Sequence, residues 1–274
     1  MNNKTTLVIG NSGKTGKRVE QQLKEMGIAT RGVSRSTNIP FDWYDASTWS
    51  KAIEDCTSAY VTFQPDLAVP GAESIIREFC DLALSSGLNK VVLLSGRGEE
   101  GAQRAEQILI NSGLEWNVVR ASWFAQNFSE GFMLDGILSG EMVLPESQVL
   151  EPFIDIDDIA DVAVAALTQD HLKNQLFEVT GPRLMTFADC IAEIAAATGK
   201  TIQLIPVTVD EYVEGLKSVG LPDDVQWLMR ELFTEVFDGR NSSIETGVYQ
   251  ALGRDATDFQ DYIYKTIASG VWSS

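Results

Sequence analysis

The chain has 274 residues, of which 44% are hydrophobic and 22% are charged, a composition typical of a globular protein with a real core. Its 39 acidic and 21 basic residues give a net charge of −18, which argues against nucleic acid or an anionic membrane as a partner. Its three cysteines form no C-x-x-C pair and no apolar run approaches membrane-spanning length, so we expect a reduced, cytoplasmic protein.

The first predicted elements are a strand, a glycine-rich turn and a helix. An apolar run at residues 7–9 predicts a buried strand, and a helical pattern covers residues 15–26. In such a turn, free backbone N–H groups and the positive end of the helix dipole face a pyrophosphate, so we predict a dinucleotide site. The alternative is a structural turn that binds nothing. The residues predicted to hold the pyrophosphate are Gly10, Asn11, Ser12, Gly13, Lys14, Thr15 and Gly16.

The glycine spacing excludes a nucleotide-triphosphatase loop. Gly13, Lys14 and Thr15 contain the G-K-T of such a loop, but its first glycine must stand five residues before Gly13, where the chain has Val8. The spacing is therefore G-x-x-G-x-x-G, which fits a dinucleotide and not a triphosphate.

The end of the second predicted strand, at residues 29–33, indicates the type of dinucleotide. Proteins that prefer NAD place an acid near this point for the ribose 2′-hydroxyl, whereas a basic residue accommodates a 2′-phosphate. No acid lies between Ala29 and Phe41, and Arg35 follows Ser34 at the strand end. We predict NADP(H), with Ser34 and Arg35 at the 2′-phosphate. The alternative is a solvated basic turn.

Strands and helices continue to alternate as far as residue 120. This alternation predicts a doubly wound parallel sheet of the Rossmann type, whose ligands lie at the carboxyl ends of the strands. Further strands are predicted at residues 41–43, 59–63, 90–94 and 116–120, and helices at 46–54, 70–86 and 101–111. The predicted cofactor residues at these strand ends are Asp42 near the adenine, Trp43, Phe63, Gln64, Pro65 and Ser95.

Beyond residue 120 the alternation loosens. Strands are predicted at residues 150–156, 176–180 and 202–207, with a helix at 158–167, and the rest reads as mainly helical. We expect a dinucleotide-binding domain at residues 1–150, with its sheet completed by parts of 150–180. A smaller, mainly helical substrate lobe is expected at residues 181–274.

Five motifs together carry a family resemblance. They are Gly10–Gly16, Phe41–Trp43, Leu93–Gly96, Val119–Asn127 and Phe153–Ala160. With them the chain, over about residues 5–270, resembles the NmrA-like atypical short-chain dehydrogenase/reductases. The Gly13-Lys14-Thr15 and Trp123–Asn127 segments are similar to those of the clavine-alkaloid dehydrogenases within that group, which reduce iminium intermediates with NADPH.

The resemblance implies where the nicotinamide and the substrate bind. Ser122, Trp123, Phe124 and Asn127 would line that pocket, although the same residues also fit the start of a core-packing helix. The family's proline after the strand arginine is Ala121 here, a departure on the nicotinamide side.

The superfamily's usual proton donor, a tyrosine followed four residues later by lysine, is missing. None of the six tyrosines has lysine at that spacing, and Tyr262 and Lys265 are only three apart. Hydride would therefore pass over Ser95 and Trp123, with Ser122 or a water as proton source. An iminium needs no proton on oxygen, and an acidic protein attracts a cation, although the charge also fits plain solubility.

Two functions stay open at this point. The first is an NADPH-dependent reductase of a small molecule with an imine, iminium, quinone or activated double bond, working as a monomer or a homodimer. The second, a non-catalytic NADP(H) redox sensor, follows from the resemblance, since other members of the family work that way.

No metal site is expected. The aspartates at 155, 157, 158 and 161 fit the cap and first turn of a helix, and the single histidine, His171, reads as a surface residue.

Overall fold

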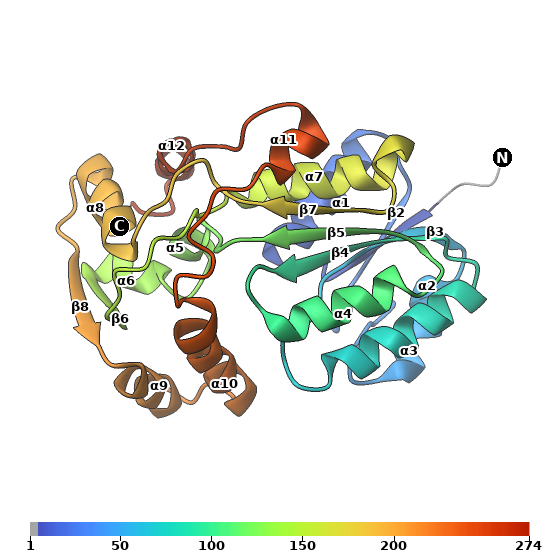
Figure 1. Ribbon diagram of the computed structural model, residues 1–274, viewed down its shortest axis with the longest axis horizontal. Helices are drawn as coiled ribbons and strands as arrows, with labels where there is room; N and C mark the ends of the chain where they lie inside the picture. The colour runs from blue at the N-terminus through green and yellow to red at the C-terminus, as the bar shows by residue number, and fades with distance from the viewer. Residues whose placement is uncertain (1–4, 274) are drawn as a thin grey trace. The chain divides into compact units, whose positions relative to one another are not determined.

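A six-stranded parallel sheet is the largest element of the computed structural model, which describes residues 5–273 (Figure 1). The strand order β2-β1-β3-β4-β5-β7 reverses its direction of growth at β1, the point where doubly wound sheets bind ligands. Its strands are β1 (Thr5–Ile9), β2 (Thr30–Val33), β3 (Cys56–Val61), β4 (Lys90–Gly96), β5 (Glu115–Ala121) and β7 (Gln175–Val179).

Helices cover both faces of this sheet, which confirms the predicted fold class (Figure 1). Their apolar residues recur every three or four positions, as in α3, where Ile76, Phe79 and Ala83 are buried. One face carries α1 (Lys14–Glu25) and α7 (Ile156–Thr168), with α11 (Gly247–Leu252) beside β7. The other carries α2 (Trp49–Ile53), α3 (Ala72–Ser85) and α4 (Glu100–Ile110). Two short 3-10 turns, η1 (Ala46–Thr48) and η2 (Asp170–Leu172), connect elements.

The predicted short strand at residues 41–43 is wrong. The segment makes only an isolated bridge between Asp42 and Asp45 and joins no sheet. Two indole N–H groups hold it instead: Trp43 donates to the carbonyl of Thr62 at 2.9 Å, and Trp49 donates to the carbonyl of Asp42 at 2.7 Å. The aromatic residues of this segment, which led to the strand prediction, are packed in the hydrophobic core under the sheet.

A second, smaller sheet pairs β6 (Glu141–Pro145) with β8 (Gln203–Val207) in parallel. The sequence predicted β8 but missed β6, and the strand predicted at 150–156 is wrong, since its residues make only isolated bridges. The accompanying helices are α5 (Asn127–Glu130), α6 (Leu134–Ser139), α8 (Phe187–Thr198), α9 (Val209–Ser218), α10 (Asp223–Glu231) and α12 (Phe259–Ser269), and α10 runs into a π-helical turn, η3 (Leu232–Val236).

The chain forms two compact units, each built from three segments. The first comprises the residues up to Ala121, Asp157–Val179 and Thr246–Arg254, and the second comprises Ser122–Ile156, Thr180–Glu245 and the residues from Asp255 onward. The domain division expected at residues 150 and 181 stays a prediction. Within residues 5–273, no helix has the length and apolar character needed to cross a membrane.

Candidate dinucleotide-binding site

The turn between β1 and α1 leaves no space for a side chain at Gly10 or Gly16. Gly10 has a φ of +80°, and a Cβ there would lie 2.2 Å from the Thr62 hydroxyl oxygen. A Cβ on Gly16 would lie 2.2 Å from the carbonyl oxygen of Gly10. Gly13 closes the turn, because its N–H donates to the same carbonyl at 2.9 Å. The glycines thus let the first turn of α1 pack directly on the end of β1.

The amino terminus of α1 offers positive potential to a ligand. Its N-cap is Gly13, which has no side chain to accept hydrogen bonds from the first turn. That turn carries no acidic residue. Thr15 is buried against the fully buried Tyr60, whose pKa burial raises above its usual value. A helix start with this composition fits a bound pyrophosphate.

The end of β2 lies beside this turn. The N–H groups of Gly10 and Asn11 donate to the carbonyl of Val33 at 2.9 and 3.3 Å. Ser34 follows, in a loop where the N–H of Ser34 donates to the Thr37 hydroxyl at 3.0 Å. Arg35 is exposed and makes no hydrogen bond or ion pair with any residue between 5 and 273. In a chain with net charge −18 such an unpaired arginine fits a phosphate ligand.

The predicted cofactor residues after Phe41 differ in how far their side chains are exposed. Asp42 is half-buried and accepts from the N–H of Tyr44 at 3.0 Å. Trp43 is 5% exposed, and its ring stacks on Phe63 at 5.0 Å, so both rings pack in the core. Gln64 is exposed and precedes Pro65 through a cis peptide bond. Their contacts with a cofactor stay predictions.

Ser95, near the end of β4, belongs to a buried charged network. Its hydroxyl donates to Glu106 on α4 at 2.6 Å, and the Glu106 side chain is fully buried. Arg120 on β5 donates to the same carboxylate through two nitrogens, which raises the pKa of Arg120. Arg120 also pairs with Glu178 at 3.2 Å, and Glu178 accepts from Arg97 at 2.6 Å.

This network determines what Ser95 can do chemically. Since an ionised carboxylate accepts only, the Ser95 proton is directed at Glu106, and its free lone pairs can accept from a ligand. Sequence reasoning missed Glu106. The available signal was its place on the apolar face of α4, with Ala102, Ala105 and Leu109 as buried neighbours.

The predicted nicotinamide-side residues belong to the second unit. Ser122 follows the last residue of β5, and its buried hydroxyl has no hydrogen-bond partner in the described part of the chain. Trp123 is 9% exposed and lies within 5.3 to 5.8 Å, by ring centroids, of Phe187, Phe233 and Phe237. Phe124 and Asn127 are half-buried. A π-helical turn, a form frequent at functional sites, positions Phe233.

Tyr262 and Lys265 do not form a catalytic pair. Tyr262 is 1% exposed and donates to the Ser129 hydroxyl at 2.9 Å, and burial raises its pKa. Lys265 pairs with the buried Asp155 at 3.4 Å. Tyr262 therefore serves the core of the second unit.

The aspartates at the start of α7 have ion-pair partners. Arg18 on α1 binds Asp157 at 2.6 Å, and Arg254 binds Asp158 at 2.7 Å. These contacts account for the acidic run that sequence analysis assigned to a helix start. Among the described residues, no group of three or more acidic, histidine or cysteine side chains could hold a metal ion.

Comparisons with known proteins agree with this architecture. No family model matches the chain. It is 30% identical over 282 residues to an agroclavine dehydrogenase of Claviceps fusiformis, covering 94% of this chain and 96% of that protein. The chain belongs to the NmrA-like family of atypical short-chain dehydrogenase/reductases.

The chain is also similar to two further known proteins. The chain is 27% identical to prestalk A differentiation protein A of Dictyostelium discoideum, over 96% of this chain and 92% of that protein. Among solved structures, it is similar to an NADPH-dependent quinone oxidoreductase of Escherichia coli crystallised with NADPH. That likeness has a TM-score of 0.79 and 16% identity, over 96% of this chain and 99% of that one. At this identity the structural likeness concerns the fold.

Proposed function

We propose that this protein is an NADPH-dependent reductase of a small organic molecule with an imine or iminium, a quinone or an activated double bond. The glycine turn carries the proposal, since Gly10 and Gly16 have no room for a side chain and bring the start of α1 directly onto the end of β1, as in a pyrophosphate-binding turn. The family contains a dehydrogenase 30% identical to this chain. The unpaired Arg35 at the end of β2 fits the 2′-phosphate that distinguishes NADP from NAD.

When bound, the cofactor supplies the hydride. In this proposal the turn from Gly10 to Gly16 holds the pyrophosphate, and Ser95, kept as an acceptor by Glu106, takes a hydrogen bond from the ligand. Ser122 has a proton to donate and no described partner, so it is the better proton source. Substrates that need no proton on oxygen would also react without it.

Oxidation of NADPH tests the enzyme function directly. We expect NADPH depletion, followed by its absorbance, with at least one compound in a panel of cyclic iminium salts, quinones and azo compounds. Tight NADP+ binding together with a flat response across the panel would instead identify a dinucleotide-binding sensor. A sensor would bind NADP+ and NADPH with clearly different dissociation constants and would have a protein partner.

Removing the Arg35 guanidinium tests the choice of cofactor. We expect Arg35→Ala to weaken NADPH binding about 10- to 100-fold and to leave NADH binding nearly unchanged, because hydrogen bonds to charged groups contribute about 1.5–3 kcal/mol. Dissociation constants from calorimetry give the result. Arg77→Ala is the matched control, since it removes an exposed arginine from α3. Equal loss for both nucleotides would contradict the role of Arg35.

A further inference from the structure

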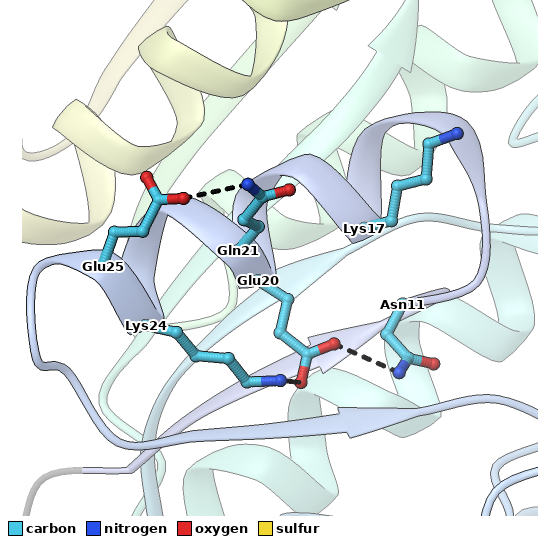
Figure 2. A pocket seen from close by; sticks show the side chains of 6 residues that line it. All are labelled: Asn11, Lys17, Glu20, Gln21, Lys24 and Glu25. Carbon is cyan, nitrogen blue, oxygen red and sulfur yellow. Dashed lines mark hydrogen bonds and ion pairs between the residues drawn. The ribbon is translucent and has the colours of Figure 1, made fainter.

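A chain of three polar side chains runs along α1 and ends at the glycine turn (Figure 2). The Lys24 ammonium lies 2.7 Å from Oε1 of Glu20, and Nδ2 of Asn11 donates to Oε2 of Glu20 at 3.2 Å. The Glu20 side chain is only 13% exposed. Asn11 is thus joined through Glu20 to a lysine that requires an acceptor.

This arrangement fixes which way the Asn11 amide points. A carboxylate paired with lysine accepts and does not donate, so Asn11 must turn its NH2 group toward Glu20. The amide oxygen, Oδ1, then points away from Glu20 (Figure 2). Oδ1 is buried and has no hydrogen-bond partner within residues 5–273. A buried acceptor without a donor costs about 1–3 kcal/mol, which a suitable ligand group would recover.

The position of Asn11 indicates which ligand group that is. A Cβ on Gly32 would lie 2.5 Å from both Nδ2 of Asn11 and Oε2 of Glu20. Because position 32 is glycine, there is room above β2 for these two hydrogen-bonded side chains. The backbone of Asn11 is bonded to Val33, the last residue of β2. In a doubly wound fold the adenosine ribose lies here, between the glycine turn and the end of the second strand.

We propose that Glu20 holds Asn11 so that its Oδ1 accepts a hydrogen bond from the 2′-hydroxyl of the adenosine ribose. Asn11 is then a binding residue and Glu20 a positioning residue that limits the preference for NADP over NAD. This inference rests on the proposed dinucleotide function. A ribose hydroxyl can donate to a fixed acceptor, whereas a 2′-phosphate brings only further acceptor oxygens. Glu20 and Arg35 therefore act in opposite directions on cofactor choice.

The variant Glu20→Gln changes which groups donate and which accept in the hydrogen bond between residue 20 and Asn11. Lys24 only donates, so it takes the single amide oxygen of the new glutamine, whose NH2 group then faces Asn11. Asn11 must turn its own oxygen toward the glutamine and its NH2 toward the ligand, where it suits a phosphate. We expect the selectivity for NADP+ over NAD+, taken from calorimetric dissociation constants, to rise about tenfold.

The charge change needs its own control. Glu25→Gln removes the same charge from the same helix, and Glu25 accepts a hydrogen bond from Gln21 at 2.9 Å and not from Asn11. We expect its selectivity to stay within about twofold of the parent protein, since exposed charges are screened. Equal selectivity shifts in both variants would mean a simple charge effect and would overturn the inference.

Asn11→Leu provides the second, independent variant, because leucine has similar size and no acceptor. NADP+ keeps only the 3′-hydroxyl, whereas its 3′-phosphate isomer keeps the 2′-hydroxyl. We expect about three- to tenfold weaker binding of the 3′-phosphate isomer and nearly unchanged binding of NADP+, because only the isomer has the hydroxyl that donates to Asn11. If the parent protein binds neither NADP+ nor NAD+, the proposed function falls as well. If it binds them but neither variant changes selectivity, only this inference is overturned.

Discussion

Replacing Glu106 by alanine lowers the free energy of unfolding by about 3–5 kcal/mol, the usual cost of removing one partner from a buried ion pair. The Glu106 side chain is fully buried and accepts from both Ser95 and Arg120. Its loss leaves the Ser95 hydroxyl buried without that acceptor and Arg120 with Glu178 alone. Urea denaturation followed by tryptophan fluorescence measures the change.

Glu73→Ala is the matched comparison for this prediction. Glu73 also accepts from an arginine Nε, that of Arg104, at 2.6 Å, but both side chains of that pair are exposed. We expect no measurable change in its unfolding free energy, since exposed ion pairs are solvated and screened. If both variants are equally stable, the buried network does not support the sheet.

Gly16→Ala weakens dinucleotide binding by tenfold or more and destabilises the fold by about 1–3 kcal/mol. The added Cβ would lie 2.2 Å from the backbone oxygen of Gly10 and 2.8 Å from its carbonyl carbon, so the turn itself must move. Binding of NADP+ by calorimetry and the thermal midpoint report the two effects separately.

The control for Gly16→Ala adds the same methyl group where space is free. Gly215 lies in α9, and nothing stands within 4 Å of a Cβ placed there. We expect Gly215→Ala to bind NADP+ like the parent protein and to gain up to about 1 kcal/mol of stability from helix propensity. Unchanged NADP+ affinity in Gly16→Ala would remove the glycine turn from the proposed site.

The glycine turn and the parallel sheet could be predicted because they depend on local patterns. Gly10, Gly13 and Gly16 mark the place where helix and strand backbones touch, and buried parallel strands read as apolar runs. The segment at residues 41–43 shows the limit of such patterns. Its aromatic residues resemble a strand, but their rings and indole N–H groups find partners in the core.

Contacts between distant positions could not be predicted from the sequence. Glu20 is nine residues from Asn11 in the chain, and Glu106 is 14 from Arg120, yet each pair forms a hydrogen bond. No acid follows β2 in the chain before Phe41, whereas α1 places the carboxylate of Glu20 above Gly32. Such pairings depend on how a helix face meets the sheet, which spacing within one element does not reveal.

The interleaving of the two units has a consequence for how the protein is made. The first unit needs Asp157–Val179, which supplies the edge strand β7, and Thr246–Arg254, which supplies α11. During synthesis at about 5–20 residues per second, the edge of β5 stays without its neighbour until residue 179 has emerged. An exposed strand edge is a template for pairing with another chain, so until β7 pairs with it the nascent chain exposes the edge of β5, which is an inner strand of the finished sheet.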